Sequence, residues 1–128
     1  MLKRNEILEN LKTKFQEDIN DVLILLDDIM TLDVSSLPLI IIKQKDTQIA
    51  IPSCYSWKHS MDIEIEIIAD NKSSSDILLE KILLSLENFS GIKNVTNINT
   101  DKMQITTSEV LNICIGVEIV YFTPSFRA

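Results

Sequence analysis

The chain has 128 residues, 45% of them hydrophobic, with 2 glycines, 3 prolines and a formal net charge of −7. A chain of this length and composition predicts one folded domain over residues 1–128, and it excludes a disordered chain or a small disulfide scaffold. The acidic balance disfavours binding to nucleic-acid phosphates, because that affinity comes from clustered Lys and Arg. The two glycines, Gly91 and Gly116, are too few and too far apart for a Gly-rich phosphate loop.

The two cysteines, Cys54 and Cys114, form no CxxC pair and have no histidine at the spacing of a zinc site. We therefore expect two reduced thiols in a reducing compartment. The N-terminal segment has charges among its apolar residues, unlike a signal peptide, and the longest apolar runs are far too short to cross a membrane. These features predict a chain that is made and kept in the cytoplasm, with no membrane partner.

An amphipathic helix is predicted from Lys3 to Asn20. Apolar residues recur there at spacings of three and four: Leu8, Leu11, Phe15 and Ile19. Val22 and Leu26 keep the same spacing, which favours continuation of the helix through Val22–Leu26. A short buried strand also fits this run, because periodicity decides poorly over so few residues.

The run Leu39–Ile42 predicts a strand, and Pro38 before it is tolerated where a strand begins. Apolar side chains stand on both faces of this strand. It therefore needs cover on both sides of a sheet, or a partner subunit on one of them. Ile40 and Ile42 are candidate interface residues for this reason.

Asp46 and Thr47 are typical of a turn, and Gln48–Ile51 then predicts a short strand that returns from it. The segment Pro52–Ser60 predicts a surface loop or a hairpin arm with aromatic side chains packed on it. It is the most chemically mixed stretch of the chain, since it holds Cys54, Tyr55, Trp57 and His59.

A nucleophilic cysteine needs a histidine beside it and a third group that orients the histidine. Cys54 and His59 are five positions apart in an extended arm, which places them on opposite faces, and no third member of a triad is visible. We therefore expect no enzyme activity. Tyr55, Trp57 and His59 are instead candidate interface residues, because aromatic side chains with a polar group are enriched at protein contacts.

Strict alternation of apolar and acidic residues predicts a half-buried strand over Met61–Asp70. Val110–Thr123 has the same period of two, so the two strands can form one apolar sheet face. Within the second strand, Gly116 stands among bulky neighbours, which indicates a bulge or the close approach of another chain.

Between these strands, Asp76–Leu86 predicts a second amphipathic helix that Ser74 or Ser75 caps. Ile92–Thr100 fits a poorly defined strand or a loop, and Asp101–Glu109 fits a short edge strand or an exposed excursion. The predicted fold class is therefore α+β: a mixed, mainly antiparallel sheet with two helices packed on one face.

Asp62, Glu64 and Glu66 share the outward face of the alternating strand. Their carboxylates are the kind of oxygen ligand that a hard cation prefers. Acidic residues on an outward strand face are ordinarily just solvated, however, and no further ligand accompanies these three. We expect no metal and no cofactor.

The order of the predicted elements resembles that of the tail terminator, or tail completion, proteins of long-tailed phages (the minor tail protein U-like family). A helix precedes a strand that opens with Pro38, and a long hairpin arm follows. The alternating strand Met61–Ile68, the helix Asp76–Leu86 and a last strand that ends in Glu118–Thr123 complete the series. The resemblance covers most of the chain.

The resemblance implies a structural protein without catalytic residues. Such proteins assemble as a ring, typically a hexamer, on the last ring of the tail tube protein, stop its polymerisation and present a surface to a head-completion protein. They act first in the host cytoplasm and then in the virion tail, and DNA slides through their lumen without specific binding. The implied lumen candidates are Asp62, Glu64, Glu66 and Glu118, because an acidic surface repels phosphates.

A second interpretation is a ferredoxin-like regulatory module, monomeric or dimeric, that holds a small ligand or a partner between sheet and helix. It predicts a concave pocket with a few convergent polar groups and no concentration-dependent ring. An enzyme that uses Cys54 and His59 is the third interpretation, and it requires a reactive Cys54 thiol at neutral pH.

Overall fold

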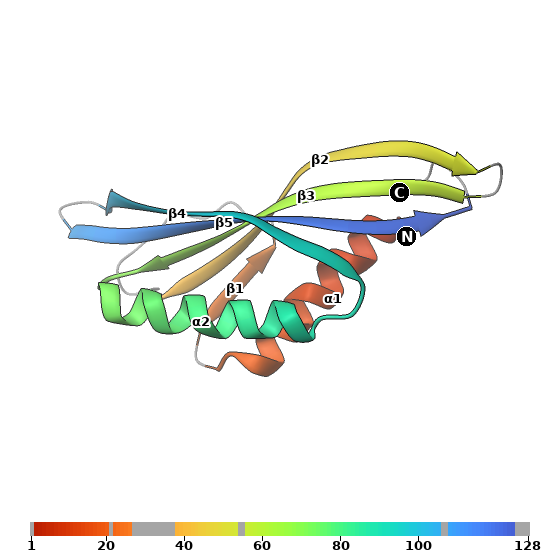
Figure 1. The fold of residues 1–128 in the computed structure, drawn as a ribbon. Helices are drawn as coiled ribbons and strands as arrows, with labels where there is room; N and C mark the ends of the chain where they lie inside the picture. The colour runs from red at the N-terminus through yellow and green to blue at the C-terminus, as the bar shows by residue number, and fades with distance from the viewer. Residues whose placement is uncertain (1, 21, 27–37, 54–55, 106–107, 125–128) are drawn as a thin grey trace.

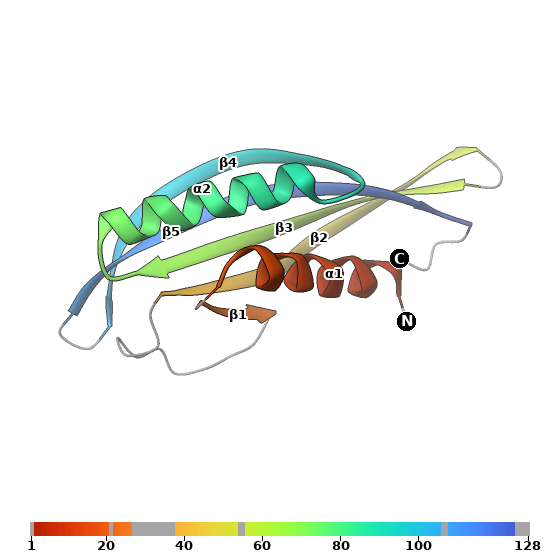
Figure 2. The same ribbon diagram turned by 90° about the horizontal axis from the view of Figure 1, so that it is seen from below.

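A computed structural model describes residues 2–20, 22–26, 38–53, 56–105 and 108–124. These residues form two helices and five strands: α1 (Lys3–Asp18), β1 (Leu23–Leu26), β2 (Leu39–Ser53), β3 (Ser56–Ala69), α2 (Lys72–Asn88), β4 (Ile92–Ile105) and β5 (Ser108–Thr123). The strands make one mixed, mainly antiparallel sheet, and both helices pack on the same face of it (Figures 1 and 2). The predicted fold class is confirmed.

The strand order in the sheet is β1-β2-β3-β5-β4. β1 runs parallel to β2, and the other three neighbouring pairs are antiparallel. After the central strand β3, the chain passes through α2 to the far edge as β4 and returns as β5 between β4 and β3. β3 and β4 therefore run in the same direction, with β5 between them.

The run Val22–Leu26 is a strand, so the prediction that the first helix continues through it is wrong. α1 ends at Asp18, and the backbone is already extended at Ile19, where φ is −124° and ψ is 112°. β1 pairs in parallel with the start of β2, from Leu23 opposite Leu39 to Leu26 opposite Ile42. β1 is an edge strand in which only Ile24 is buried, and so short an apolar run satisfies the helical spacing by accident.

The main core lies between the sheet and the two helices, and most of its buried residues come from α1, α2, β2, β3 and β5. Its largest fully buried side chains include Leu11, Phe15, Ile40, Ile42, Met61, Ile63, Ile65, Ile67 and Ile82. Burying a side chain of this size stabilises the fold by roughly 1.5–3 kcal/mol relative to its exposure. The alternation read in the sequence is thus the alternation that fills the core.

Both faces of Leu39–Ile42 are covered within the single chain. Ile40 and Ile42 lie in the main core, with 0% of their surface exposed. Leu39 and Ile41 face the other way and join Ile68 and Val110 in a smaller apolar cluster. This strand therefore does not need a partner subunit to bury its apolar groups.

α2 begins four residues earlier than the sequence predicts. Asn71 is its N-cap, and the Asn71 side chain accepts a hydrogen bond of 2.8 Å from the backbone N–H of Ser74. The predicted cap, Ser74 or Ser75, is wrong because both serines lie inside the helix. The Ser75 hydroxyl donates to the Lys72 carbonyl instead, which satisfies it within the first turn.

The predicted turn at Asp46 and Thr47 is also wrong. β2 continues through these residues with an irregularity in its pairing to β3 between Gln44 and Thr47. The polar residues lie at an irregularity in the strand pairing, and the chain does not reverse its direction there. The predicted short strand Gln48–Ile51 is the continuation of β2 in its original direction.

At this end the sheet extends beyond both helices as a narrow ribbon (Figures 1 and 2). We call the described hairpin part of this ribbon the arm: residues Thr47–Ala50 of β2 and Ser56–Ser60 of β3. The two segments pair antiparallel, with Ile49 opposite His59. The predicted hairpin arm is therefore present, although Cys54 and Tyr55 lie outside the described residues.

β4 is a full-length edge strand. The prediction of a poorly defined strand or loop over Ile92–Thr100 did not identify it, because one extra residue in the strand breaks the alternation of apolar side chains. The pairing with β5 shifts between Val95 and Asn97, which leaves Thr96 as a bulge. The bulge lets Val95 and Ile98 face the helices together although they are three positions apart. Gly116 lies opposite the bulge, and a Cβ there would collide with the side chains of Asn97 and Thr96.

Candidate functional site

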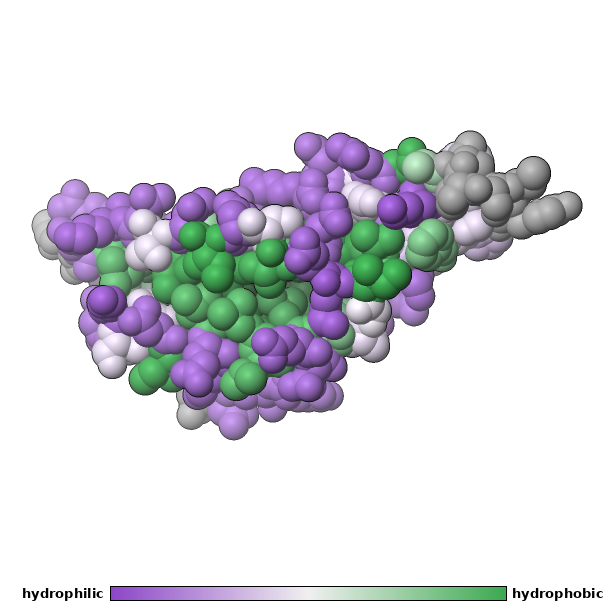
Figure 3. All heavy atoms as spheres, in the orientation of Figure 1, coloured by the Kyte–Doolittle hydropathy of each residue, from purple (hydrophilic) through white to green (hydrophobic). Residues whose placement is uncertain are grey.

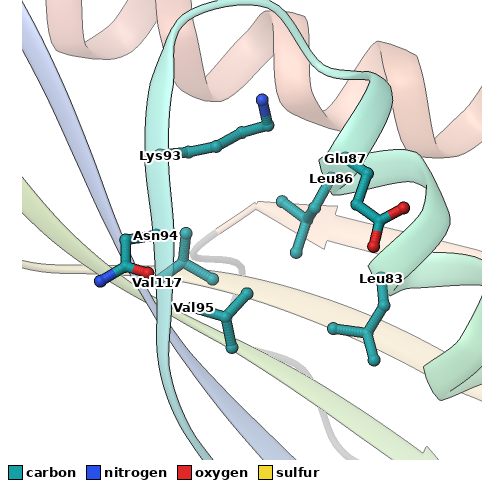
Figure 4. A pocket seen from close by; sticks show the side chains of 7 residues that line it. All are labelled: Leu83, Leu86, Glu87, Lys93, Asn94, Val95 and Val117. Carbon is teal, nitrogen blue, oxygen red and sulfur yellow. The ribbon is translucent and has the colours of Figure 1, made fainter.

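An open apolar groove lies between α2 and the edge strand β4, with a volume of about 460 Å³. Leu83 of α2 and Val95 of β4 point toward each other across it, and Val117 of β5 lies beneath them (Figure 4). The groove is lined by Leu83, Leu86, Glu87, Lys93, Asn94, Val95 and Val117. It exists because α2 covers β3 and β5 but leaves the helix-facing side of β4 open.

The apolar surface continues from the groove along α2 and β4. Exposed fractions are 53% for Leu84, 38% for Val95 and 43% for Ile98. Figure 3 shows the resulting apolar patch between α2 and the sheet, bordered by polar side chains. Contiguous exposed apolar surface of this kind marks a contact site more often than scattered single residues do.

Carboxylates line the α2 side of this surface. A second hollow of about 370 Å³ adjoins the groove on α2, and Leu83 and Glu87 line both. The second hollow also includes Asp76 and Glu80. On the opposite side, β4 contributes Lys93 to the groove. The groove itself thus has one carboxylate, Glu87, on its helical side and Lys93 on its strand side, and the other two carboxylates lie in the adjoining hollow.

A small polar cluster is buried where the arm meets α1. His59 is 0% exposed, its Nε2 lies 2.7 Å from the Thr123 Oγ1, and its ring stacks on Tyr121 with 4.8 Å between centroids. Burial raises the pKa of Tyr121, and the Arg4 charge opposes that shift. Four buried polar atoms in the described residues have no hydrogen-bond partner: Arg4 Nε, Thr47 Oγ1, His59 Nδ1 and Tyr121 Oη. Each such atom costs roughly 1–3 kcal/mol, so the base of the arm is less stabilised than the apolar core.

The acidic face of the sheet, opposite the helices, is partly neutralised. Lys43 Nζ lies 2.9 Å from Glu66 Oε2, and Lys45 Nζ lies 3.7 Å from Glu64 Oε2. The hydrogen bond with Glu66 raises the pKa of Lys43. These pairs form because β2 places its lysines beside β3, on the face that carries the glutamates. Two of the four lumen candidates are therefore ion-paired.

The other two lumen candidates, Asp62 and Glu118, are direct neighbours. They pair across β3 and β5, so two like charges stand side by side on one face. A hollow of about 450 Å³ adjoins Asp62 and Glu64 on the sheet, where Gly116 contributes no side chain. This part of the face keeps a negative surplus, because Lys43 and Lys45 pair with Glu66 and Glu64 and leave Asp62 and Glu118 without an ion pair among the described residues.

Glu64, Glu66 and Cys114 bring their ligand atoms within 4.8 Å of one another. Two features make this group a salt-bridge network and a poor metal site. Lys43 and Lys45 already neutralise the two carboxylates. Burial and the nearby Glu66 charge raise the pKa of the Cys114 thiol to about 11, so the thiolate that a metal needs is scarce at neutral pH.

The predicted interface residues fall into different places. Ile40, Ile42 and His59 are completely buried inside the chain, so their side chains offer no surface to a partner. Trp57 is half-buried and pairs with Thr123 on the arm. Tyr55 and Cys54 lie outside the described residues, so the structure does not describe the contact between Cys54 and His59 that the enzyme interpretation needs.

Sequence reasoning missed the groove. The sequence predicts Asp76–Leu86 only as an amphipathic helix packed on the sheet, and Ile92–Thr100 only as a poorly defined strand or a loop. The signal was present in the breadth of the apolar face of α2, which has more apolar residues than one sheet contact can bury. The bulge at Thr96, which turns Val95 toward the groove, could not be read from the sequence.

No protein-family model matches the chain, and no curated protein matches it. Among the described residues, neither helix has the length and apolar character needed to span a membrane.

Proposed function

We propose that this protein is a structural subunit of a phage or prophage tail. In this proposal it is a tail terminator that caps the tail tube, stops its polymerisation and provides the surface to which the head joins. It works as a homo-oligomeric ring, a hexamer as is typical of the family it resembles, first in the host cytoplasm and then in the virion tail. Its partners are the tail tube protein and a head-completion protein.

The observation that carries the proposal is the apolar groove between α2 and β4. The core is complete within one chain, since both faces of Leu39–Ile42 are covered. The exposed apolar groups of Leu84, Val95 and Ile98 are therefore not needed for folding. Surface of this kind is retained for contact with another protein, as a ring or cap requires.

The acidic sheet face is the feature that supports the proposed passage of DNA. Asp62 is exposed, and Glu118 beside it is half-buried, so this surface repels phosphates. The ion pairs of Lys43 and Lys45 hold the remaining carboxylates in fixed positions without reversing the sign of the surface. DNA would pass such a face without adhering to it.

The proposal is tested by adding the protein to a polymerising tail tube protein and measuring tube lengths by electron microscopy. We expect shorter tubes of uniform end structure, with the protein at one end of each. A Val95→Lys variant should lose this effect, whereas Ile92→Lys should keep it, because Ile92 is 59% exposed on the same strand but faces away from the groove. Tubes that grow unchanged with the unmodified protein would contradict the proposal.

The same groove favours one second candidate, a ferredoxin-like module that binds a small ligand. Glu87 and Lys93 are polar groups on either side of an otherwise apolar pocket between helix and sheet. This candidate predicts a monomer or dimer whose melting temperature rises with a co-purified small molecule. A ring that assembles without any ligand would exclude it.

A further inference from the structure

The helix layer of the protein leaves one strand of the sheet uncovered. The two helices pack over β1, β2, β3 and β5, and the groove lies where a further helix would pack on β4 (Figures 2 and 4). Val95 and Ile98 of β4 face this gap with 38% and 43% of their surface exposed. We infer that α2 of a second copy fills the groove, so that the free protein is a two-fold dimer with its grooves face to face. This inference goes beyond the proposed function, because the dimer needs no tail tube.

The helix α2 has apolar side chains on the side that faces away from its own sheet. Ile77 and Leu84 are each 53% exposed. They are seven positions apart, which is about two turns of helix, so they lie on the same side of α2. In the dimer this side of α2 turns toward β4 of the other copy, where Val95 and Ile98 lie. Apolar groups that each chain leaves exposed are then buried by the other copy.

Charge complementarity fixes how the two copies meet. Glu87 lines the α2 side of the groove and Lys93 lines the β4 side. Among the described residues neither forms an ion pair, and the Lys93 Nζ reaches only the Gly91 carbonyl oxygen, at 3.5 Å. A two-fold axis along the groove lays the α2 side of each copy against the β4 side of the other. Glu87 of each copy then meets Lys93 of the other, and the pair forms twice.

The positions of these two residues also match along the axis. The chain passes from the end of α2 to the start of β4 through residues 89–91 only, so Glu87 and Lys93 lie at the same end of the groove. A rotation about an axis along the groove keeps each residue at its own height on that axis. The carboxylate and the ammonium of different copies therefore come together without any shift of one copy along the other.

A two-fold axis across the groove fits less well. It would set α2 of one copy on α2 of the other and leave both β4 strands uncovered. It would also bring Glu87 toward Asp76 and Glu80 of the other copy, which lie on the same helix, and like charges oppose such a contact. With the axis along the groove, Leu83 lies beside the axis, so the two Leu83 side chains meet.

Charge reversal tests the contact in a form that only a second copy can satisfy. Glu87→Lys alone and Lys93→Glu alone should each weaken dimerisation roughly tenfold or more, because each change occurs twice in a two-fold contact. An equimolar mixture of the two variants should form heterodimers about as tightly as the unmodified protein, because both pairs are then opposite in charge. An effect within one chain would not recover on mixing. Sedimentation velocity with one variant fluorescently labelled measures the association, and thermal melting checks folding.

The apolar centre of the contact is tested with matched variants on β4. Val95→Lys should weaken dimerisation roughly tenfold or more. Ile92→Lys is the control and should leave the dimer intact, because Ile92 is 59% exposed but faces the other side of the sheet. A Leu83→Cys chain in a Cys54→Ser background should cross-link to itself through a short bismaleimide, and Ile92→Cys in the same background should not.

The outcomes separate the dimer from the proposed function. Unmodified protein that stays monomeric at high concentration, or charge variants that do not recover on mixing, would overturn the inference. A larger oligomer in which Leu83→Cys does not cross-link would overturn the groove-to-groove contact and leave the ring of the proposed function standing. The measurement of tube lengths decides that function separately, because it does not depend on how the free protein associates.

Discussion

Replacing Lys43 by Met should destabilise the fold by removing the ion pair with Glu66. The Lys43 Nζ lies 2.9 Å from Glu66 Oε2, and the side chains are 39% and 12% exposed. Exposed pairs contribute about 0–1 kcal/mol, and loss of one partner of a fully buried pair costs about 3–5 kcal/mol. The half-exposed lysine places this pair between the two cases, so we expect a loss of about 1–2 kcal/mol. For a domain of this size that lowers the melting temperature by about 3–10 °C.

The assay is urea unfolding of four proteins: the unmodified chain, Lys43→Met, Glu66→Gln and the double variant. Met keeps most of the aliphatic contact of the lysine, and Gln keeps the shape of the glutamate, so the cycle isolates the charge interaction. The double variant should be less destabilised than the sum of the single variants. A sum that is strictly additive would refute the reasoning, because the two side chains would then be independent.

The pH dependence of stability gives a second check on the same pair. The hydrogen bond with Glu66 raises the pKa of Lys43 above its ordinary value of 10.5. A raised pKa in the folded state means that the stabilisation is fully present below the unfolded pKa and disappears as pH rises through the folded pKa. The unmodified protein should therefore lose stability above about pH 10.5 more steeply than Lys43→Met. Parallel curves for the two proteins would contradict this account.

Three further predictions concern other parts of the fold. Ser85→Ala removes the hydroxyl that donates a 2.7 Å hydrogen bond to Asp18 Oδ2, and this bond is the main cause of the lowered pKa of Asp18. The variant should therefore lose less stability than the unmodified chain as pH falls below 3.8, the ordinary pKa of the group. Acid titration followed by circular dichroism measures the difference. Gly116→Val should lower the free energy of unfolding in urea by about 1–3 kcal/mol, because the new side chain would collide with the side chains of Thr96 and Asn97. An unchanged unfolding midpoint would show that Thr96 and Asn97 move aside freely. Cys114 should react slowly with a thiol reagent at pH 8 in a Cys54→Ser background, because its pKa is about 11; rapid labelling of the folded chain would refute this.

The sequence predicts the core better than it predicts the edges of the fold. The alternation over Met61–Asp70 identifies β3 because one face of this strand is buried by helices and the other carries charges. The spacing of Leu8, Leu11 and Phe15 identifies α1 for the same reason. A regular burial pattern gives regularly spaced apolar residues in the sequence, and both α1 and β3 show this spacing.

The errors lie where the backbone departs from regular spacing. Thr96 adds one residue to β4, so Val95 and Ile98 share a face at a spacing that fits no simple strand. β1 pairs with β2 at one edge of the sheet, and its unbroken apolar run shows no period of two. The polar residues Asp46 and Thr47 mark an irregularity in pairing, which has the same composition as a turn.

The candidate site was harder to predict than the core, because it depends on what α2 leaves uncovered. Ile40 and Ile42 are apolar on a strand with two apolar faces, and such residues are buried by their own chain as readily as by a partner. The groove depends on how far β4 lies from the helix, a distance that no local pattern encodes. The partial neutralisation of Glu64 and Glu66 depends likewise on the register between β2 and β3.

The position of β5 has a consequence for how the chain folds. β5 follows the other described strands in the sequence, yet it lies between β3 and β4 and pairs with both along nearly its whole length. Until residues 108–123 have left the ribosome, β3 has an open edge with apolar side chains on one face, and β4 has no neighbour. A chain shortened before Ser108 should therefore aggregate instead of forming a smaller stable domain. The centre of this sheet is completed last, by contacts between residues far apart in the sequence, which favours slow folding.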